Sequence, residues 1–140
     1  MARYEWSYEE SINGATDLTA EQWLRVTWEG APRPLRGFLP LAWKFGLGLR
    51  LGSSADPARV LGWLVARSDR DLVTIVADSW MISAENSVSR DGDRLRWQTI
   101  VTYKNVIGRT VWMPARLVHQ RLIRLMMGRA IRHVTTTRPI

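Results

Sequence analysis

The side chain in this sequence best suited to acid–base chemistry is His119, one of only two histidines in 140 residues. An imidazole with an ordinary pKa of about 6.5 can exchange a proton with a ligand or hydrogen-bond to it. It can equally be a core histidine whose ring is held by neighbouring polar groups. Asp78 interrupts the apolar run 72–77 and could orient His119 or bind a ligand hydroxyl, although an aspartate there more often ends a strand. Arg129 needs an anionic partner such as Asp78, or a path to solvent, because a buried unpaired charge is very costly.

Other catalytic and metal-binding patterns are missing from the sequence. There is no cysteine, and two histidines are too few for a multi-histidine zinc site. No Ser-His-Asp order, P-loop or pair of carboxylates stands out, and Gly46-x-Gly48 lacks the third glycine of a dinucleotide-binding loop and follows no strand. We therefore expect no metal and no cofactor, and we favour a binding protein over an enzyme.

His119 would be positioned by a long helix predicted at residues 105–133, the most strongly periodic stretch of the chain. At about 100° per residue, its apolar residues fall on one continuous arc, which is the pattern of a helix that lies along a large surface. His119 lies near the edge of that arc and Arg129 near its middle. The arc comprises Ala115, Val118, Leu122, Leu125, Met126 and Ala130.

A strand and a helix are predicted near the start of the chain. Residues 4–12 alternate between aromatic and polar side chains, which indicates a half-buried strand, and Asn13-Gly14 supplies turn chemistry after it. Residues 18–29 form the helix, with Thr19 and Gln22 at the spacing of a capping box. The face expected to be buried comprises Trp23, Leu24, Thr27 and Trp28.

The segment 35–52 is apolar yet rich in glycine, and each glycine weakens a helix by about 1 kcal/mol relative to alanine. We expect a short helix near 40–45, followed by a loop through 53–57. The large side chains of this segment are too many for a solvated loop, so they cap a core, form a lid over a cavity, or contact a membrane surface, the last being the least favoured. These side chains are Phe38, Leu39, Trp43 and Phe45.

From residue 59 onward the pattern predicts an antiparallel meander. The polar residues 68–71 form one turn, and Asp91-Gly92 is a strong signal of a hairpin. The strands are expected at 60–67, 72–78, 81–90 and 94–104. The last strand is the clearest, because one side of it is covered; the residues on that side are Leu95, Trp97, Thr99, Val101 and Tyr103.

Spaced residues in the second half of the chain match a family pattern. They are Tyr103-x-Asn105-x-x-Gly108-Arg109-x-x-Trp112, His119, Met126-Met127 and Ala130-Ile131, with Asp91-Gly92 in the preceding hairpin. By these residues and by its order of elements, the chain resembles the START-like, Bet v 1-like superfamily, also called SRPBCC, over nearly its whole length. It is most similar to a group of uncharacterised bacterial single-domain members. One departure is Leu117, where that group has a proline two residues before the histidine; here Pro114 stands five residues before it.

The resemblance implies an α+β helix-grip fold over residues 1–140, in which a curved antiparallel sheet wraps around the long C-terminal helix and two short helices follow the first strand. It also implies a cavity between the sheet and that helix. Members of the superfamily use this cavity for lipids, polyketides or other hydrophobic molecules, and the aromatase/cyclases catalyse reactions in it, whereas others bind protein partners. The most similar group has no assigned activity.

We therefore expect the chain to bind a hydrophobic or amphipathic small molecule, such as a lipid, a polyketide or an aromatic metabolite, between the sheet and residues 112–130, with residues 35–52 at the entrance. The eight tryptophans either line this pocket or fill the core. The alternatives are a cyclase- or dehydratase-like enzyme with His119 as its acid and base, and a protein-interaction or basic-surface binding domain with a filled core. The candidate ligand-binding residues are Trp43, Trp63, Asp78, Trp97, Tyr103, Trp112, His119, Leu122 and Met126.

Charge and hydropathy limit the partners and the compartment. The net charge is +7, with six acids in residues 1–30, and with seven arginines and no acids in residues 105–140. Nucleic acid is disfavoured as a partner, because the arginines are not interleaved with stacking aromatics and the acidic part can neutralise them. Acids stand where a signal peptide would be apolar, and Pro40, Lys44 and Arg50 break the most apolar run, so we expect a cytoplasmic protein. The oligomeric state is left open.

Overall fold

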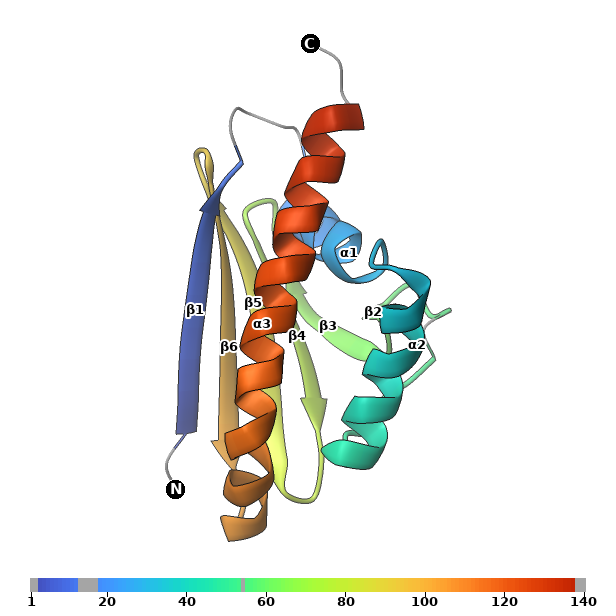
Figure 1. The fold of residues 1–140 in the computed structure, drawn as a ribbon, viewed down its shortest axis with the longest axis vertical. Helices are drawn as coiled ribbons and strands as arrows, with labels where there is room; N and C mark the ends of the chain where they lie inside the picture. Colours follow the sequence, from blue (N-terminus) through green and yellow to red (C-terminus); the bar gives the residue numbers. More distant parts are fainter. Residues whose placement is uncertain (1–2, 13–17, 54, 138–140) are drawn as a thin grey trace.

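The computed structural model describes residues 3–12, 18–53 and 55–137, without the side chains of 135–137. It is an α+β protein with a six-stranded antiparallel sheet in the order β1-β6-β5-β4-β3-β2, and the long last helix, α3, runs along one side of that sheet (Figure 1). In chain order the elements are β1 (Arg3–Ser11), α1 (Ala20–Trp28), α2 (Arg33–Leu41), the π-helical turn η1 (Ala42–Gly46), β2 (Arg59–Val60), β3 (Trp63–Ser68), β4 (Leu72–Asp78), β5 (Ile82–Asp91), β6 (Arg94–Tyr103) and α3 (Val106–Thr137).

The sheet follows the alternation of its sequence. In β1 the aromatic residues are half-buried and most of the residues between them are exposed, as predicted, while the turn predicted at Asn13-Gly14 lies outside the described residues. The hairpin at Asp91-Gly92 is confirmed, because Asp91 pairs with Arg94 and Gly92 has a φ of 62°. The alternation in β6 is confirmed as well, since its apolar side is buried. One face of the sheet therefore holds the core and the other meets solvent.

One strand of the meander differs from the prediction. The single strand expected at 60–67 is divided into β2 and β3 by a tight turn at Leu61 and Gly62, whose φ angles are 47° and 93°. Positive φ at both central residues gives the turn type that joins two antiparallel strands closely, and Val60 pairs with Trp63 across it. A Cβ at Gly62 would lie only 2.9 Å from the carbonyl oxygen of Gly52, so glycine also allows this close approach.

Helix α1 is anchored by its cap and by its inner face. The Thr19 side chain accepts a hydrogen bond from the Gln22 backbone N–H at 3.2 Å, and the Gln22 side chain accepts one from the Thr19 N–H at 2.8 Å, which confirms the predicted capping box. The predicted inner face is buried as well; it comprises Trp23, Leu24, Thr27 and Trp28. This helix lies between α3 and strands β4 and β5.

The second helix begins earlier than the sequence pattern predicted. A helix was expected near 40–45, but α2 begins at Arg33 and continues through η1 to Gly46. Pro34 lies in the first turn, where a missing N–H leaves no hydrogen bond unmade, so this proline starts the helix. Pro40 stands near the end of α2, and the backbone widens into the π-helical turn just after it. The two prolines are therefore accommodated near the two ends of α2.

Helix α3 confirms the predicted long helix and part of its predicted face, since Met126 and Ala130 are buried and Ala115 and Leu122 half-buried. Val118 and Leu125 are 53% and 58% exposed, although both were placed on the buried arc. The helix is rotated relative to that prediction, so that a neighbouring apolar stripe, which carries the large Trp112, faces inward. The buried face comprises Trp112, Ile123, Met126, Met127, Ala130, Ile131 and Val134.

The corner between β6 and α3 accounts for two of the spaced residues, Asn105 and Gly108. The Asn105 side-chain oxygen accepts a hydrogen bond from the Gly108 N–H at 3.0 Å, and its amide donates to the Trp80 carbonyl at 3.1 Å. Gly108 packs so closely on the Met81 carbonyl oxygen that a Cβ would overlap it. Each residue therefore has a structural task in joining the first turn of α3 to the β4–β5 connection.

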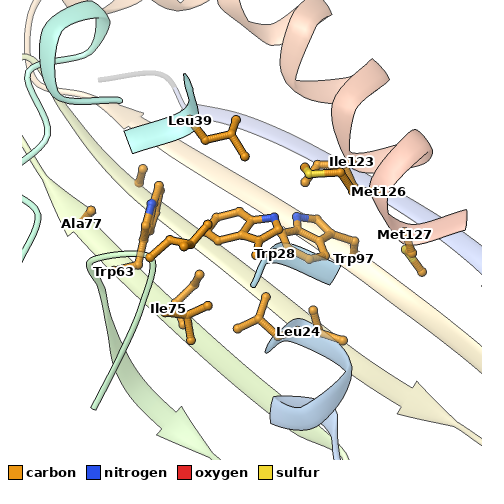
Figure 2. Packing of buried hydrophobic residues seen from close by; sticks show 14 of the residues in the cluster. Leu24, Trp28, Leu39, Trp63, Ile75, Ala77, Trp97, Ile123, Met126 and Met127 are labelled. Atoms are coloured by element: carbon orange, nitrogen blue, oxygen red, sulfur yellow. The ribbon is translucent and has the colours of Figure 1, made fainter. Parts of the chain in front are cut away.

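Four tryptophans fill the centre of the core. The ring centroid of Trp28 lies 4.8 Å from that of Trp43, 5.6 Å from Trp63 and 5.3 Å from Trp97. Figure 2 shows Trp28 between Trp63 and Trp97, with Leu39 above them, side chains of α3 at the right, and Ile75 and Leu24 below. Trp63 and Trp97 are thus part of the packed interior beneath α1 and α3.

Candidate functional site

A small apolar pocket lies between the α2–η1 segment and α3. Its volume is about 240 Å³, and the half-exposed Phe38 and Val118 stand at its mouth. All its described lining residues come from α1, α2, η1, α3 or Leu47, and none comes from the sheet. The pocket therefore lies where the entrance to the predicted cavity was expected, and the space over the sheet is filled by tryptophans. The lining comprises Trp28, Phe38, Leu39, Ala42, Trp43, Gly46, Leu47, Val111, Trp112, Ala115, Val118, His119, Leu122, Ile123 and Met126.

The structure brings five of the nine candidate ligand-binding residues together at this pocket. They are Trp43, Trp112, His119, Leu122 and Met126. Trp63, Trp97 and Tyr103 are buried in the core outside the lining. Asp78 is an exposed residue at the end of β4, and its carboxylate accepts a hydrogen bond from Ser83 and lies 4.0 Å from Lys104 Nζ.

His119 is held by a chain of buried polar groups on the sheet. Its Nε2 lies 2.8 Å from the Thr99 hydroxyl, which donates to Asn86 Oδ1 at 2.6 Å. Asn86 Oδ1 also accepts from the Trp97 indole N–H at 3.1 Å. Because Thr99 has one hydroxyl hydrogen and gives it to Asn86, Nε2 carries the imidazole hydrogen and donates to Thr99. The partner of His119 is thus Thr99, and Asp78 is occupied elsewhere.

Burial keeps the His119 ring neutral. Removal from water lowers its pKa to about 4. The rings of Trp6 and Trp112 lie 6.0 and 5.5 Å from it, centroid to centroid, and supply an apolar surrounding. At pH 7 the ring therefore has one N–H, which is bound to Thr99, and one unprotonated nitrogen, Nδ1, with no partner among the described residues.

Two indole N–H groups beside the pocket also have no acceptor. The Nε1 atoms of Trp28 and Trp112 are buried and have no hydrogen-bond partner among the described residues. Leaving such a group unpaired costs about 1–3 kcal/mol, so most buried donors are paired. Trp23 and Trp63 share this property, but they lie outside the pocket lining. The wall of the pocket therefore contains two unpaired donors, and both are covered by neighbouring side chains and not exposed at the pocket surface.

Arg129 stands near the middle of the predicted apolar arc of α3, but its charge is not buried. It is exposed, and its guanidinium donates a hydrogen bond to the Gly30 carbonyl at 2.8 Å. It borders a second hollow, of about 390 Å³, between the end of α1 and α3. Arg25 in that hollow is compensated by Glu21 and Glu29, at 3.0 and 3.1 Å. Its polar side chains thus already have partners, and we assign no function to it.

The sequence reasoning missed several residues of the site. Trp28 was assigned to the core, yet one edge of it borders the pocket. Thr99 and Asn86, which hold His119, were not singled out. Both are polar residues on the buried side of a strand, and this pattern could have marked them, because an inward-facing polar group needs a partner.

Comparisons with known proteins leave the family open. No protein-family model matches the chain, and no curated protein matches its sequence. Two findings come from the described residues themselves: no helix among them is long and apolar enough to cross a membrane, and they hold no group of three or more potential metal ligands. The function is therefore argued from the pocket.

Proposed function

We propose that this chain is a helix-grip domain of the START-like type that binds a small hydrophobic molecule carrying a hydrogen-bond acceptor, in the pocket between α2–η1 and α3. The strand order, with β1 paired to β6 and a long helix along the sheet, supports this fold assignment. The observation that carries the function is the apolar pocket whose wall contains two buried, unpaired N–H donors. The cytoplasm remains the expected compartment.

The size of the pocket narrows the class of ligand. A cavity of about 150 Å³ holds benzene, and sites for drug-sized ligands are about 300–1,000 Å³. At about 240 Å³, this pocket suits a substituted aromatic ring or a short acyl chain. Of the three ligand classes expected from the sequence, we therefore favour an aromatic metabolite over a whole lipid or a polyketide.

The polar groups at the pocket narrow the chemical class of the ligand. The indole N–H groups of Trp28 and Trp112 donate, whereas His119 Nδ1 accepts. A carbonyl oxygen satisfies a donor, and a hydroxyl group satisfies either kind of partner. The ligand is thus an aromatic ketone, aldehyde or phenol, neutral because the wall is apolar and holds no cationic side chain among its described residues.

Binding is better supported than cyclase or dehydratase chemistry. His119 is the one titratable side chain among the described lining residues, and with a pKa of about 4 it is a neutral imidazole at pH 7, so the imidazolium that would act as a general acid is absent. A reaction that needs a general acid at pH 7 would require a second group, which the described lining does not supply. The tryptophan-filled core is consistent with the remaining alternative, a protein-interaction domain. The experiment below distinguishes that alternative from small-molecule binding.

Acetophenone and ethylbenzene test the proposal, because they have similar shapes and only the former has a carbonyl. The eight tryptophans give indole N–H signals that can be followed by nitrogen–proton correlation NMR. We expect both compounds to bind, and acetophenone to bind about tenfold more tightly and to shift the Trp28 or Trp112 signal downfield. Trp112→Phe and Trp28→Phe assign these signals and remove one donor each.

Two variants of α3 control for the position of binding. Ala115→Trp places a large ring at a residue that lines the pocket and should abolish binding of both compounds. Leu125→Trp places the same ring on the exposed side of the helix and should leave binding unchanged. Saturable binding that survives Ala115→Trp would refute this site. No shift with either compound would refute small-molecule binding and favour the interaction domain.

A further inference from the structure

Large apolar side chains are exposed together at one end of the molecule. Phe45 in η1 is 82% exposed, Trp80 in the β4–β5 turn is 55% exposed, and Val106 at the start of α3 is 70% exposed. Figure 1 shows these three segments at the same end, where the N-terminal end of α3 lies. The Asn105 amide joins two of them, since it donates to the Trp80 carbonyl at 3.1 Å. We call this surface the apolar end; it comprises Phe45, Trp80, Val106 and Ile107.

The α2–η1 segment extends the apolar end along the outside of the molecule. Phe38, Leu41 and Phe45 are separated by three and four residues, the spacing that places side chains on one side of a helical segment. All three are more than half exposed, whereas Leu39 and Trp43 on the opposite side are buried. The segment is thus amphipathic with its outer apolar side uncovered.

Positive charges surround this apolar surface. The sequence has no acidic residue between Glu29 and Asp56, and five exposed cations on α2, on η1, just after η1 and in the first turn of α3 form no ion pair with a carboxylate among the described residues. Asp78, at the end of β4, lies 4.0 Å from Lys104 Nζ, so its charge is offset. The unpaired exposed cations are Arg33, Arg36, Lys44, Arg50 and Arg109.

We propose that the apolar end and the outer side of α2–η1 dock onto an anionic lipid bilayer. Exposed aromatic side chains insert at the level of the lipid headgroups, and neighbouring cations are attracted to anionic lipids, which is the composition of interfacial membrane-binding surfaces. A second copy of the chain would bring Lys44 and Arg50 against like charges, so a homodimer through this end is disfavoured. The mouth of the pocket, at Phe38, then faces the lipid.

Sedimentation with vesicles tests the docking. We expect the protein to bind vesicles of phosphatidylcholine and phosphatidylglycerol in equal parts, and not vesicles of phosphatidylcholine alone. Phe45→Ser should lower partitioning about tenfold, because one large apolar group no longer inserts. Lys44→Gln and Arg50→Gln should each lower it about fivefold. Leu125→Ser and Arg67→Gln are the controls, since both residues are exposed and lie away from the apolar end.

A single label reports the orientation, because the natural chain has no cysteine. An environment-sensitive dye on Phe45→Cys should shift to the blue on mixed vesicles. The same dye on Leu125→Cys should not, since Leu125 lies about 28 Å farther along α3 than Val106 at about 1.5 Å per residue. No sedimentation, equal loss in the controls, or a blue shift at Leu125 would each overturn the proposal. It would also be overturned by a dimer that Phe45→Ser dissociates in the absence of lipid.

Discussion

Helices α1 and α2 are both nine residues long and follow each other in the chain, but the fold holds them very differently. α1 has a complete capping box and buries five of its residues against the sheet and α3. α2 has no side-chain cap, contains two prolines and a glycine, and buries only Leu39. The first helix is therefore part of the core, and the second covers it from outside.

The two features proposed to bind partners, the pocket and the exposed aromatic residues, both involve the weakly held α2–η1 segment. The pocket borders α2 and η1, and the exposed aromatic residues lie on the same segment. Segments with few buried contacts open at lower free energy than the core, and they are the usual position of lids and binding surfaces. α1 supplies the rigid wall through Trp28, while α2–η1 supplies the wall that can move.

The largest predicted effect is the loss of a core tryptophan from α1. Trp28→Ala should lower the free energy of unfolding by about 3–5 kcal/mol, because three other tryptophan rings pack on it. Phe38→Ala on α2 should cost less than about 0.5 kcal/mol, since this side chain is half exposed. Urea unfolding followed by circular dichroism measures both. Equal losses would mean that α2 is as much a part of the core as α1.

The second prediction concerns His119, at the boundary between the two regions. Its pKa is about 4 in the folded state and about 6.5 when unfolded, so between these values the unfolded chain binds more protons. Stability should therefore fall as the pH is lowered from 6.5 to 4, by at most about 3 kcal/mol. Urea midpoints across this range measure the slope. His119→Gln should remove the contribution of His119 to the slope of unfolding free energy against pH, while the carboxylates contribute equally to both proteins. Identical slopes in the two proteins would contradict a buried neutral ring.

A smaller effect should follow from loss of the α1 cap. Thr19→Ala removes the side-chain oxygen that accepts from the Gln22 N–H and should cost about 1 kcal/mol. Thr19→Ser keeps that oxygen and should stay within about 0.3 kcal/mol of the natural protein. Thermal unfolding of the three proteins gives the comparison. A serine variant as unstable as the alanine variant would show that the cap does not anchor α1.

The sequence predicted the parts of the fold whose pattern is local. Alternation in β1 and β6, the capping box at Thr19 and the Asp91-Gly92 hairpin are each set by neighbouring residues, and all are confirmed. The rotation of α3 was wrong, because two apolar stripes share this helix and the choice between them depends on what the sheet presents. A helical period gives the width of a face but not which of two faces turns inward.

The site was harder to predict than the fold. Trp43, Trp112 and His119 were correctly placed near one another, but nothing local shows that Trp97 packs in the core beside Trp28. Volume is decided by how side chains from different elements fit together. For the same reason, the sequence could not place the pocket under α2–η1 and away from the sheet.

The smallest predicted effect tests whether α2 is a helix held loosely in solution. Gly37 lies inside α2, and a Cβ there would meet no atom within 4 Å, so Gly37→Ala should raise the free energy of unfolding by about 0.5–1 kcal/mol. Hydrogen exchange should show slower opening of the α2 amides. Gly108→Ala is the contrasting change, because its Cβ would overlap the Met81 carbonyl oxygen and destabilise the corner before α3. If Gly37→Ala destabilises the protein, this segment is not the helix described, and the weakly held wall of the pocket must be sought elsewhere.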